Sequence, residues 1–436
     1  MTKTITLEKA FDLKAGENKH LSAEVFETVD VEGVPLGKPI YNQEMDKNTS
    51  KREKERKLGW TNVGDIGAVI KTTVGLGEVY KNTDTPHVAV SSKHTRPVAI
   101  AIGKTQLEAL IKATAGDLNS PFGGFYGFNT ELEPETAEFL TREGMFYEGA
   151  LAPKISKEVE KIFENNPERF LIETGELTKA DLYVLGATYA PTILGKFIKQ
   201  SLEPEFDVRK EAVVVTGNNG NTDINSLDDE MLNNIQFAGN AAIYLASNLV
   251  FYVSQGAIAG LGDGCGARTV AAEKGRRMLE VSAYAAVSAN NSSKWDSVLY
   301  DTPFTREEFE SIIKPELKIV AFSDAFYPKL DGFVETAGVD RTNSEFGQRK
   351  VQIGKQGADL FIPKRDNFDP EYNRQLIPVV IVQPGGSKGD VVTMPLAEKY
   401  DIKQVLTMDK DTFDKYQEVG PGKGVSGRRF FGHIIM

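Results

Sequence analysis

The adjacent residues Lys93 and His94 place a cation beside an imidazole in a chain that has only 4 histidines. Short apolar runs at residues 88–90 and 98–102 flank the pair and predict two strands joined by a polar turn. The lysine charge disfavours protonation of the imidazole, because like charges repel, and a neutral histidine can accept a proton near neutral pH. A surface lysine beside a histidine bonded to the backbone would give the same pattern, so the interpretation depends on the groups that accompany the pair.

Two further segments carry groups suited to a flat, polar ligand. Phe122 and Gly123 lie in a predicted turn, where glycine lets a ligand approach the backbone and a phenyl face can stack on a heterocycle. A plain turn with a core phenylalanine is the alternative. Asn248 follows an apolar run at residues 241–246, and a buried amide needs hydrogen-bond partners. That amide is either a structural group or a donor to a carbonyl oxygen that gains charge during acyl transfer.

A glycine-rich loop at residues 260–268 precedes a helix predicted over residues 269–289. Gly262, Gly264 and Ala267 match one register of a dinucleotide-binding fingerprint, with Glu280 near the expected acidic position. A nucleotide-dependent oxidoreductase is therefore one alternative. The more general interpretation is a loop that holds an anion at the N-terminus of a helix.

Polar loops follow two predicted buried strands near the end of the chain. Asp324 comes after residues 319–322, and Asp390 comes after residues 378–382. Ligands of α/β proteins usually bind at the carboxyl ends of strands. Asp390 is suited to accept hydrogen bonds from an amino-pyrimidine edge, although it would equally cap a helix. The tail at residues 426–433 is rich in Arg and Phe and ends in His, which indicates phosphate binding with aromatic stacking or a solvated tail.

Composition and patterning set the frame for these groups. The 436 residues carry a net charge of −11, which argues against general nucleic-acid binding, and the single Cys265 excludes an internal disulfide framework and a cysteine-rich zinc site. There is no apolar leader and no apolar run of about 18 residues, so we expect a cytoplasmic protein without membrane contact. Strands alternate with helices, which predicts an α/β fold. Helical periodicity covers residues 179–201, and a break just after them predicts domains at 1–205 and 206–436.

The motifs, in this order, resemble the transformylase half of a bifunctional purine-biosynthesis enzyme, 5-aminoimidazole-4-carboxamide ribonucleotide (AICAR) formyltransferase. The resemblance runs from about Leu13 to His433. The matching segments are residues 13–21, 58–65, 93–97, 122–124, 148–153, 247–248, 260–268, 323–328, 383–390 and 429–433.

The resemblance implies transfer of a formyl group from 10-formyltetrahydrofolate to the 5-amino group of AICAR, giving FAICAR on the route to IMP. It implies that His94 takes the amine proton, that Lys93 stabilises charge near the formyl group and that Asn248 holds the formyl oxygen. The residues implied to bind AICAR are Lys14, Asn62, Gly123, Glu148, Arg429 and Phe431. The residues implied to bind the folate co-substrate are Phe122, Arg268, Thr269 and Asp390.

The same resemblance implies two cytidine-deaminase-like α/β/α units in tandem without zinc, and a homodimer with active sites at the interface. No cyclohydrolase residues precede Leu13, so we expect a monofunctional formyltransferase whose product needs another enzyme for ring closure. The chain departs from the family pattern at Lys14-Ala15, Ala99 and Cys265-Gly266, and it has an extra segment at residues 409–424. An inactive AICAR-binding homologue is a further alternative.

Overall fold

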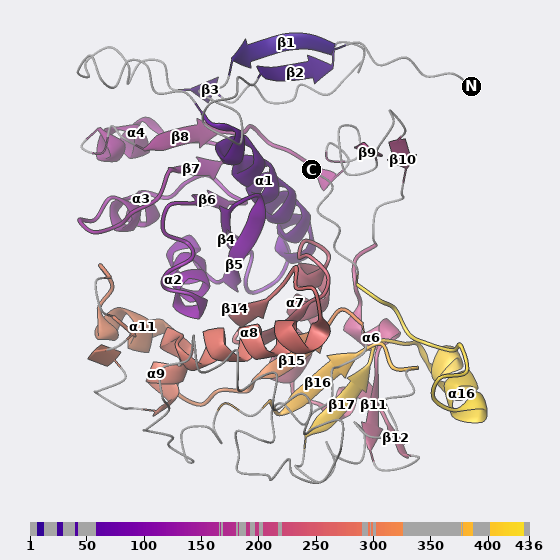
Figure 1. Ribbon diagram of the computed structural model, residues 1–436. Helices are drawn as coiled ribbons and strands as arrows, with labels where there is room; N and C mark the ends of the chain where they lie inside the picture. Colours follow the sequence, from indigo (N-terminus) through magenta and orange to yellow (C-terminus); the bar gives the residue numbers. More distant parts are fainter. Residues whose placement is uncertain are drawn as a thin grey trace, which may run out of the picture.

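The computed structural model describes residues 7–12, 24–28, 40–41, 58–164, 166, 169–179, 182, 189–191, 197–199, 204–216, 220–289, 295–296, 298–299, 302–325, 376, 378–386 and 402–430. Within these residues, 13 strands form one mixed sheet in the order β12-β11-β17-β16-β15-β13-β14-β5-β4-β6-β7-β8-β3. Helices pack on both of its faces (Figure 1). The predicted α/β fold is therefore confirmed.

The first half of the sheet is built around a hairpin followed by parallel strands. Strands β4 and β5 pair antiparallel, β4 pairs antiparallel with β6, and β6, β7 and β8 run parallel. The strands are β4 (His87–Lys93), β5 (Arg96–Gly103), β6 (Phe125–Phe128), β7 (Gly149–Ala152) and β8 (Phe170–Glu173), with β3 (Ile40–Tyr41) at the outer edge. The strands predicted on either side of Lys93-His94 are thus confirmed.

The second half repeats this arrangement. Strands β13 and β14 form an antiparallel hairpin, β13 pairs antiparallel with β15, and β15, β16 and β17 run parallel. The strands are β13 (Val250–Ser254), β14 (Ala257–Gly262), β15 (Val320–Ser323), β16 (Val380–Gln383) and β17 (Lys403–Leu406), with β11 (Val213–Thr216) and β12 (Gly220–Thr222) beyond β17. The two halves meet where β14 pairs antiparallel with β5.

Helices cover the two faces of the sheet because its strands are apolar on both sides. Ala89 belongs to one core, with helices α2 (Gln106–Gly116), α3 (Pro134–Leu140), α4 (Lys157–Phe163), α8 (Arg268–Glu280), α9 (Ala283–Ala289) and α11 (Arg306–Ile312). Its neighbours Val88 and Val90 belong to the opposite core, with α1 (Trp60–Tyr80) and α7 (Asp229–Ala242). Alternate residues of a strand point to opposite faces, so the central residues of β4, from Val88 to Ser92, are all buried.

Shorter elements complete the described parts of the chain. They are β1 (Leu7–Asp12) and β2 (Glu24–Thr28), which pair antiparallel, then α6 (Val208–Glu211), the 3-10 helix η3 (Ile224–Ser226) and α16 (Lys410–Val419). Helix α16 accounts for most of the extra segment noted at residues 409–424. No helix among the described residues is long and apolar enough to cross a bilayer.

Two helix predictions need correction. Residues 179–201 were expected to form a helix, but Tyr189–Pro191 and Phe197–Lys199 form the antiparallel strands β9 and β10. Pro191 lacks an N–H and is unfavourable inside a helix, and the helical spacing of the apolar residues does not take this into account. The helix expected to continue through residues 269–289 is interrupted at Ser282, whose side-chain oxygen accepts a hydrogen bond from the Ala285 N–H and starts α9 as a separate helix.

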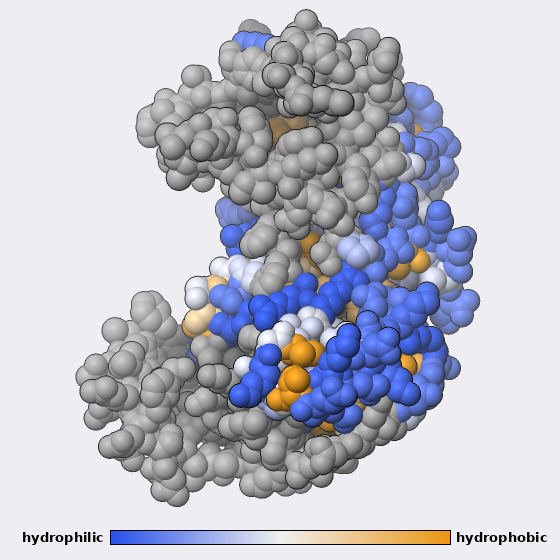
Figure 2. All heavy atoms as spheres, turned by 90° about the vertical axis from the view of Figure 1, so that its right-hand side faces the viewer, coloured by the Kyte–Doolittle hydropathy of each residue, from blue (hydrophilic) through white to orange (hydrophobic). Residues whose placement is uncertain are grey.

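The division into domains at 1–205 and 206–436 stays a prediction. Strands β4 to β8 come from the first range and β11 to β17 from the second. In Figure 1 the former, indigo to magenta, lie above the orange and yellow strands of the latter. The side face in Figure 2 is mainly hydrophilic over the described residues, with apolar atoms in small separate patches.

Candidate functional site

The turn between β4 and β5 presents His94 in a strained backbone conformation. Lys93 pairs with Arg96, so His94 and Thr95 form a two-residue hairpin loop, and their φ angles are 56° and 66°. Two positive φ angles define a turn that usually contains Asn-Gly. The left-handed conformation costs roughly 1–2 kcal/mol for a residue with a Cβ atom, and a β-branched threonine is a marked outlier there. Such strain is typical of functional sites, where the surrounding structure must hold the turn in place.

Helix α1 supplies that support. The buried carboxylate of Asp65 accepts a hydrogen bond from the Thr95 N–H at 2.6 Å. One residue earlier, a Cβ atom on Gly64 would collide with the Thr95 methyl group, so only glycine lets the helix come this close. The helix and the turn therefore form one rigid unit with His94 exposed at its end.

Burial is the largest influence on Asp65 and raises the pKa of its carboxyl to about 6. The Thr95 N–H, the Ser92 hydroxyl and the positive charge of Lys93 act in the opposite direction, whereas the negative charge of Glu148 raises the pKa further. Asp65 therefore titrates close to neutral pH, next to the two residues proposed from sequence for proton and charge chemistry.

Four of the residues singled out from sequence come together beside this turn. Lys93 Nζ donates to the carbonyl oxygen of Phe122 at 2.8 Å, and Gly123 lies next to the same amine with a φ angle of 82°. The Glu148 N–H donates to Gly124 O at 2.8 Å, which brings Glu148 alongside. The Phe122 ring is half-buried against Phe304, with 6.4 Å between ring centroids, so part of it packs in the core.

A second group surrounds Asn248, between α7 and β13. Asn248 Oδ1 accepts a hydrogen bond from Arg268 Nη2 at 2.9 Å, and Asn248 Nδ2 donates to Cys265 O at 2.9 Å. The guanidinium of Arg268 also binds the fully buried Asp324 through Nε and Nη2, at 3.2 and 3.1 Å. Asp324 in turn accepts from the Ser247 hydroxyl at 2.5 Å. The amide of Asn248 is therefore oriented, and among the described residues one Nδ2 hydrogen has no acceptor.

The departure at Cys265 does not remove the contact that orients Asn248, because the main-chain carbonyl of Cys265 makes it. Burial raises the pKa of the Cys265 thiol, so the side chain stays protonated at neutral pH.

The two groups lie on neighbouring loops. Arg96, the first residue of β5, is in contact with the glycine-rich loop, because a Cβ atom on Gly264 would collide with the Arg96 guanidinium. The positive charge of Arg96 also reaches the Cys265 thiol. The hairpin that carries Lys93 and His94 thus sits against the loop that orients Asn248.

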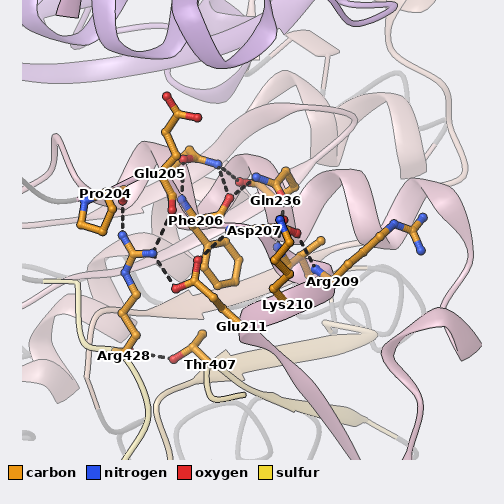
Figure 3. A network of polar contacts seen from close by, with 12 residues as sticks. Pro204, Glu205, Phe206, Asp207, Arg209, Lys210, Glu211, Gln236, Thr407 and Arg428 are labelled. Carbon is orange, nitrogen blue, oxygen red and sulfur yellow. Dashed lines mark hydrogen bonds and ion pairs between the residues drawn. The ribbon is translucent and has the colours of Figure 1, made fainter. Parts of the chain in front are cut away.

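The C-terminal tail is fixed by Arg428, a residue that the sequence analysis did not single out. The Arg428 guanidinium donates to Glu211 Oε2 at 2.7 Å, to Glu205 O at 3.1 Å and to Pro204 O (Figure 3). The next residue but one, Phe430, is fully buried and packs edge-on against Phe206 and Phe322. Arg429, between them, is exposed.

The remaining predicted residues are placed as follows. Asn62 Oδ1 accepts from the Gly59 N–H at 2.8 Å and helps to start α1. Thr269 is the second residue of α8. Lys14, Phe431 and Asp390 lie outside the described residues.

Two features of the site escaped the sequence analysis. No role was assigned to Asp65, although Asp65, Ala68, Val69 and Thr72 share the buried face of α1 and a lone acid on such a face is a recognisable signal. The bond between Arg268 and Asn248 could not be read from sequence, because it depends on how the loop folds back. Among the described residues, no group of at least 3 His, Cys, Asp or Glu side chains could hold a metal ion.

The fold and the site define an α/β protein whose ionisable and amide side chains gather on loops around one sheet, as in enzymes that act on small molecules. A family model described as the AICARFT/IMPCHase bienzyme matches residues 1–277. The chain therefore belongs to this family of purine-biosynthesis enzymes.

Curated relatives agree with this assignment. The chain is 29% identical over 262 residues to the bifunctional purine biosynthesis protein PurH of Chlorobium phaeovibrioides, covering 60% of this chain and 44% of that protein. It is 28% identical over 399 residues to PurH of Paracoccus denitrificans, covering 91% of this chain and 58% of that protein. The chain spans about half the length of the curated relatives that it matches.

Proposed function

We propose that the chain is a formyltransferase that moves the formyl group of 10-formyltetrahydrofolate onto the 5-amino group of AICAR and yields FAICAR and tetrahydrofolate. The observation that carries the proposal is the pairing of an exposed, strained His94 with an oriented Asn248 amide on adjoining loops. Acyl transfer from an amide-like donor to an aryl amine needs a base, an oxyanion donor and alignment, and these loops offer all three.

In the proposed mechanism, the nitrogen of the 5-amino group attacks the formyl carbon and forms a new C–N bond. His94 takes the proton that the amine releases, because its imidazole is exposed and makes no hydrogen bond to another described residue. The formyl oxygen becomes an oxyanion that accepts from Asn248 Nδ2–H and lies in the field of the Lys93 ammonium. The bond between the formyl carbon and N10 of the folate then breaks, and N10 receives the proton that His94 took from the amine.

Other residues hold the two substrates in this proposal. Glu148 binds the ribose hydroxyls, and the AICAR site further includes Asn62, Gly123, Lys14, Arg429 and Phe431. Phe122, Thr269 and Asp390 face the folate. Arg268 binds Asp324 and Asn248 through Nε and Nη2. Among the described contacts this leaves Nη1 to bind the folate directly, and Arg268 has its larger effect by orienting Asn248.

The tandem cytidine-deaminase-like architecture belongs to the same proposal. Its support is the repeated strand order, β5-β4-β6-β7-β8 and β14-β13-β15-β16-β17, with the same strand directions in both halves. A homodimer with active sites at its interface is proposed from the resemblance, and light scattering of the purified chain tests it.

The oxidoreductase alternative is less well supported. A dinucleotide-binding unit needs two neighbouring parallel strands joined by the helix. Here α8 follows β14, but β13 lies between β14 and the next strand of the core sheet, β15. Gly262 is required because α8 packs directly on it, as a Cβ atom there would collide with Ala271 O.

Formyl transfer by the purified full chain tests the function. We expect FAICAR from AICAR and 10-formyltetrahydrofolate, and none from AICAR with formate and ATP. Product only with formate and ATP would show a different formyl donor. AICAR binding without turnover under either condition would indicate an inactive homologue, and stabilisation by NAD but not by AICAR would overturn the proposal.

A further inference from the structure

We propose that Asp65 is a positioning residue that holds the backbone of the His94-Thr95 turn in the conformation that presents the His94 imidazole. Its effect on turnover rests on the proposed formyltransferase function, whereas its effect on His94 can be measured without any reaction.

Asp65 contacts the His94-Thr95 turn directly. Asp65 is 3% exposed and its Oδ1 accepts the Thr95 N–H at 2.6 Å, and a hydrogen bond to a carboxylate is shorter and stronger than one between neutral groups. Thr95 is β-branched and rarely adopts a positive φ angle, so the turn depends on its surroundings. Among the described residues, this hydrogen bond and the contact of Thr95 with Gly64 support the turn.

The other half of the sheet contains the same arrangement. The hairpin β13–β14 also has a two-residue turn, Gln255-Gly256, with φ angles of 53° and 73°. The Gly256 N–H donates to Asn234 Oδ1 at 2.9 Å, and Asn234 is 1% exposed. Asp65 and Asn234 each lie five residues after the first residue of their helix, Trp60 and Asp229.

Comparison of the two turns distinguishes the hydrogen bond that Asp65 accepts from the charge that it carries. A neutral amide oxygen is enough to hold the Gln255-Gly256 turn, so an oxygen acceptor at this helix position is the shared requirement. The side chains with charge near Asp65 are Lys93 from β4 and Glu148 from the segment before β7, and Ser92 lies beside it. Substituting asparagine at position 65 therefore keeps the acceptor and removes the charge.

The kinetic test compares Asp65→Ala, which removes the acceptor, with Asp65→Asn, which keeps it. For Asp65→Ala we expect kcat to fall about 100-fold, because a small displacement of a reacting group costs about that much, while KM for AICAR changes by less than about 3-fold. For Asp65→Asn we expect kcat within about 5-fold of the wild type. A loss in Asp65→Asn as large as that in Asp65→Ala would overturn the proposal, because the charge and not the hydrogen bond would then matter.

Two further variants guard against a general folding defect. Asn234→Ala makes the matched change in the other hairpin and should lower thermal stability while leaving kcat within about 2-fold. Thr95→Gly places at this position the residue that Gly256 provides in the other turn. In the Asp65→Ala background it should restore at least about 10-fold of the lost kcat, because glycine needs no support at this φ angle. No recovery in the folded double variant would contradict the proposal.

Histidine NMR of the unliganded protein gives a readout independent of turnover. The resonances of the His94 ring, assigned by their loss in His94→Gln, should shift and broaden in Asp65→Ala and stay close to the wild-type values in Asp65→Asn. The His87 resonances should not move in either variant. Unchanged His94 resonances in Asp65→Ala would overturn the proposal even if the wild type has no formyltransferase activity, and absent wild-type activity would count against the proposed function alone.

Discussion

The two hairpin turns of the central sheet share a backbone design and differ in the use of their side chains. In the turn of β13–β14, Gln255 is bound at both ends of its amide, donating to Lys314 O at 2.9 Å and accepting from Lys314 N–H at 3.0 Å. Glycine occupies the second position, and a neutral Asn234 supports it. In the turn of β4–β5, His94 is exposed, a β-branched residue takes the second position and an ionisable Asp65 supports it.

The two turns differ in the backbone strain of their second residue. In the turn whose side chain is used for structure, only Gln255 is strained, because glycine takes the second position. The turn that presents an imidazole has a β-branched threonine at its second position, which a positive φ angle disfavours, and a buried acid supports it. We infer that the first half of the sheet was shaped by a requirement other than stability, and the following predictions test that inference.

The largest effect should come from removing the presented side chain. His94→Ala should lower kcat about 1,000-fold, the usual scale for loss of a general base, and leave the Kd for AICAR within about 3-fold. Gln255→Ala, the matched change in the other turn, should leave kcat unchanged. The measurement is steady-state formyl transfer together with calorimetric titration of AICAR, and substantial turnover by His94→Ala would show that another group takes the proton.

The next effect concerns the contribution of the second half to the same chemistry. Asn248→Ala should lower kcat about 100-fold, because it removes a donor to the oxyanion, with a smaller change in KM. Arg268→Lys should lower kcat in the same direction, since lysine cannot hold Asn248 and Asp324 together. If Asn248→Ala turned over normally, the catalytic groups would lie in the first half alone.

A third effect is the pH dependence of stability. The pKa of Asp65 in the folded chain, about 6, lies above the ordinary value of 3.8, so the folded state binds a proton more tightly than the unfolded state. Its contribution to stability is therefore full below about pH 4 and is lost as the pH rises through 6.

As the pH rises from about 4 through 6, the free energy of unfolding of Asp65→Asn should increase relative to that of the wild type, by on the order of 2 kcal/mol. The reverse exchange in the other turn, Asn234→Asp, should destabilise the protein at pH 7 and much less at pH 4. Urea unfolding at both pH values measures the four differences, and an Asp65→Asn difference that does not vary with pH would contradict the raised pKa.

The smallest effect is the strain of the turn itself. Gly256→Ala should reduce the free energy of unfolding by about 1–2 kcal/mol, because alanine disfavours the positive φ angle and its Cβ atom would press on Ile102. Thr95→Gly should change stability by less than about 1 kcal/mol, since relief of strain is offset by the greater freedom of glycine in the unfolded chain. A large loss for Thr95→Gly would mean that Thr95 is not strained.

The local parts of this comparison were predictable from the sequence, and the long-range parts were not. Short apolar runs predicted the strands on both sides of Lys93-His94, and residue type alone marked His94 and Asn248 as candidates for the chemistry. The left-handed turn was not predictable, because His-Thr is not a pair that such turns favour. The hydrogen bond between Asp65 and Thr95, and that between Arg268 and Asn248, join residues 30 and 20 positions apart, and no periodicity reports such contacts.

The tail shows the same limit. Its arginine and phenylalanine residues were expected to bind a phosphate and stack on a ligand or to be solvated, but one arginine and one phenylalanine turn inward, where Arg428 binds Glu211 and Phe430 fills the core. Which residues of such a tail face a ligand depends on the alternation of its extended backbone, and the register of that alternation is set by the packing of Phe430.

The contacts that anchor the tail form late in the synthesis of the chain. Arg428 bonds to residues 217 and 223 positions earlier in the chain, and the Phe430 N–H donates to Asp324 O at 2.9 Å, next to the carboxylate that binds Arg268. These contacts cannot form until residues 428 to 430 have left the ribosome. Because pairings between distant residues form late, the surroundings of Asn248 are completed only after translation has passed Phe430, so a premature stop shortly before it should leave a folded sheet with an unfinished site.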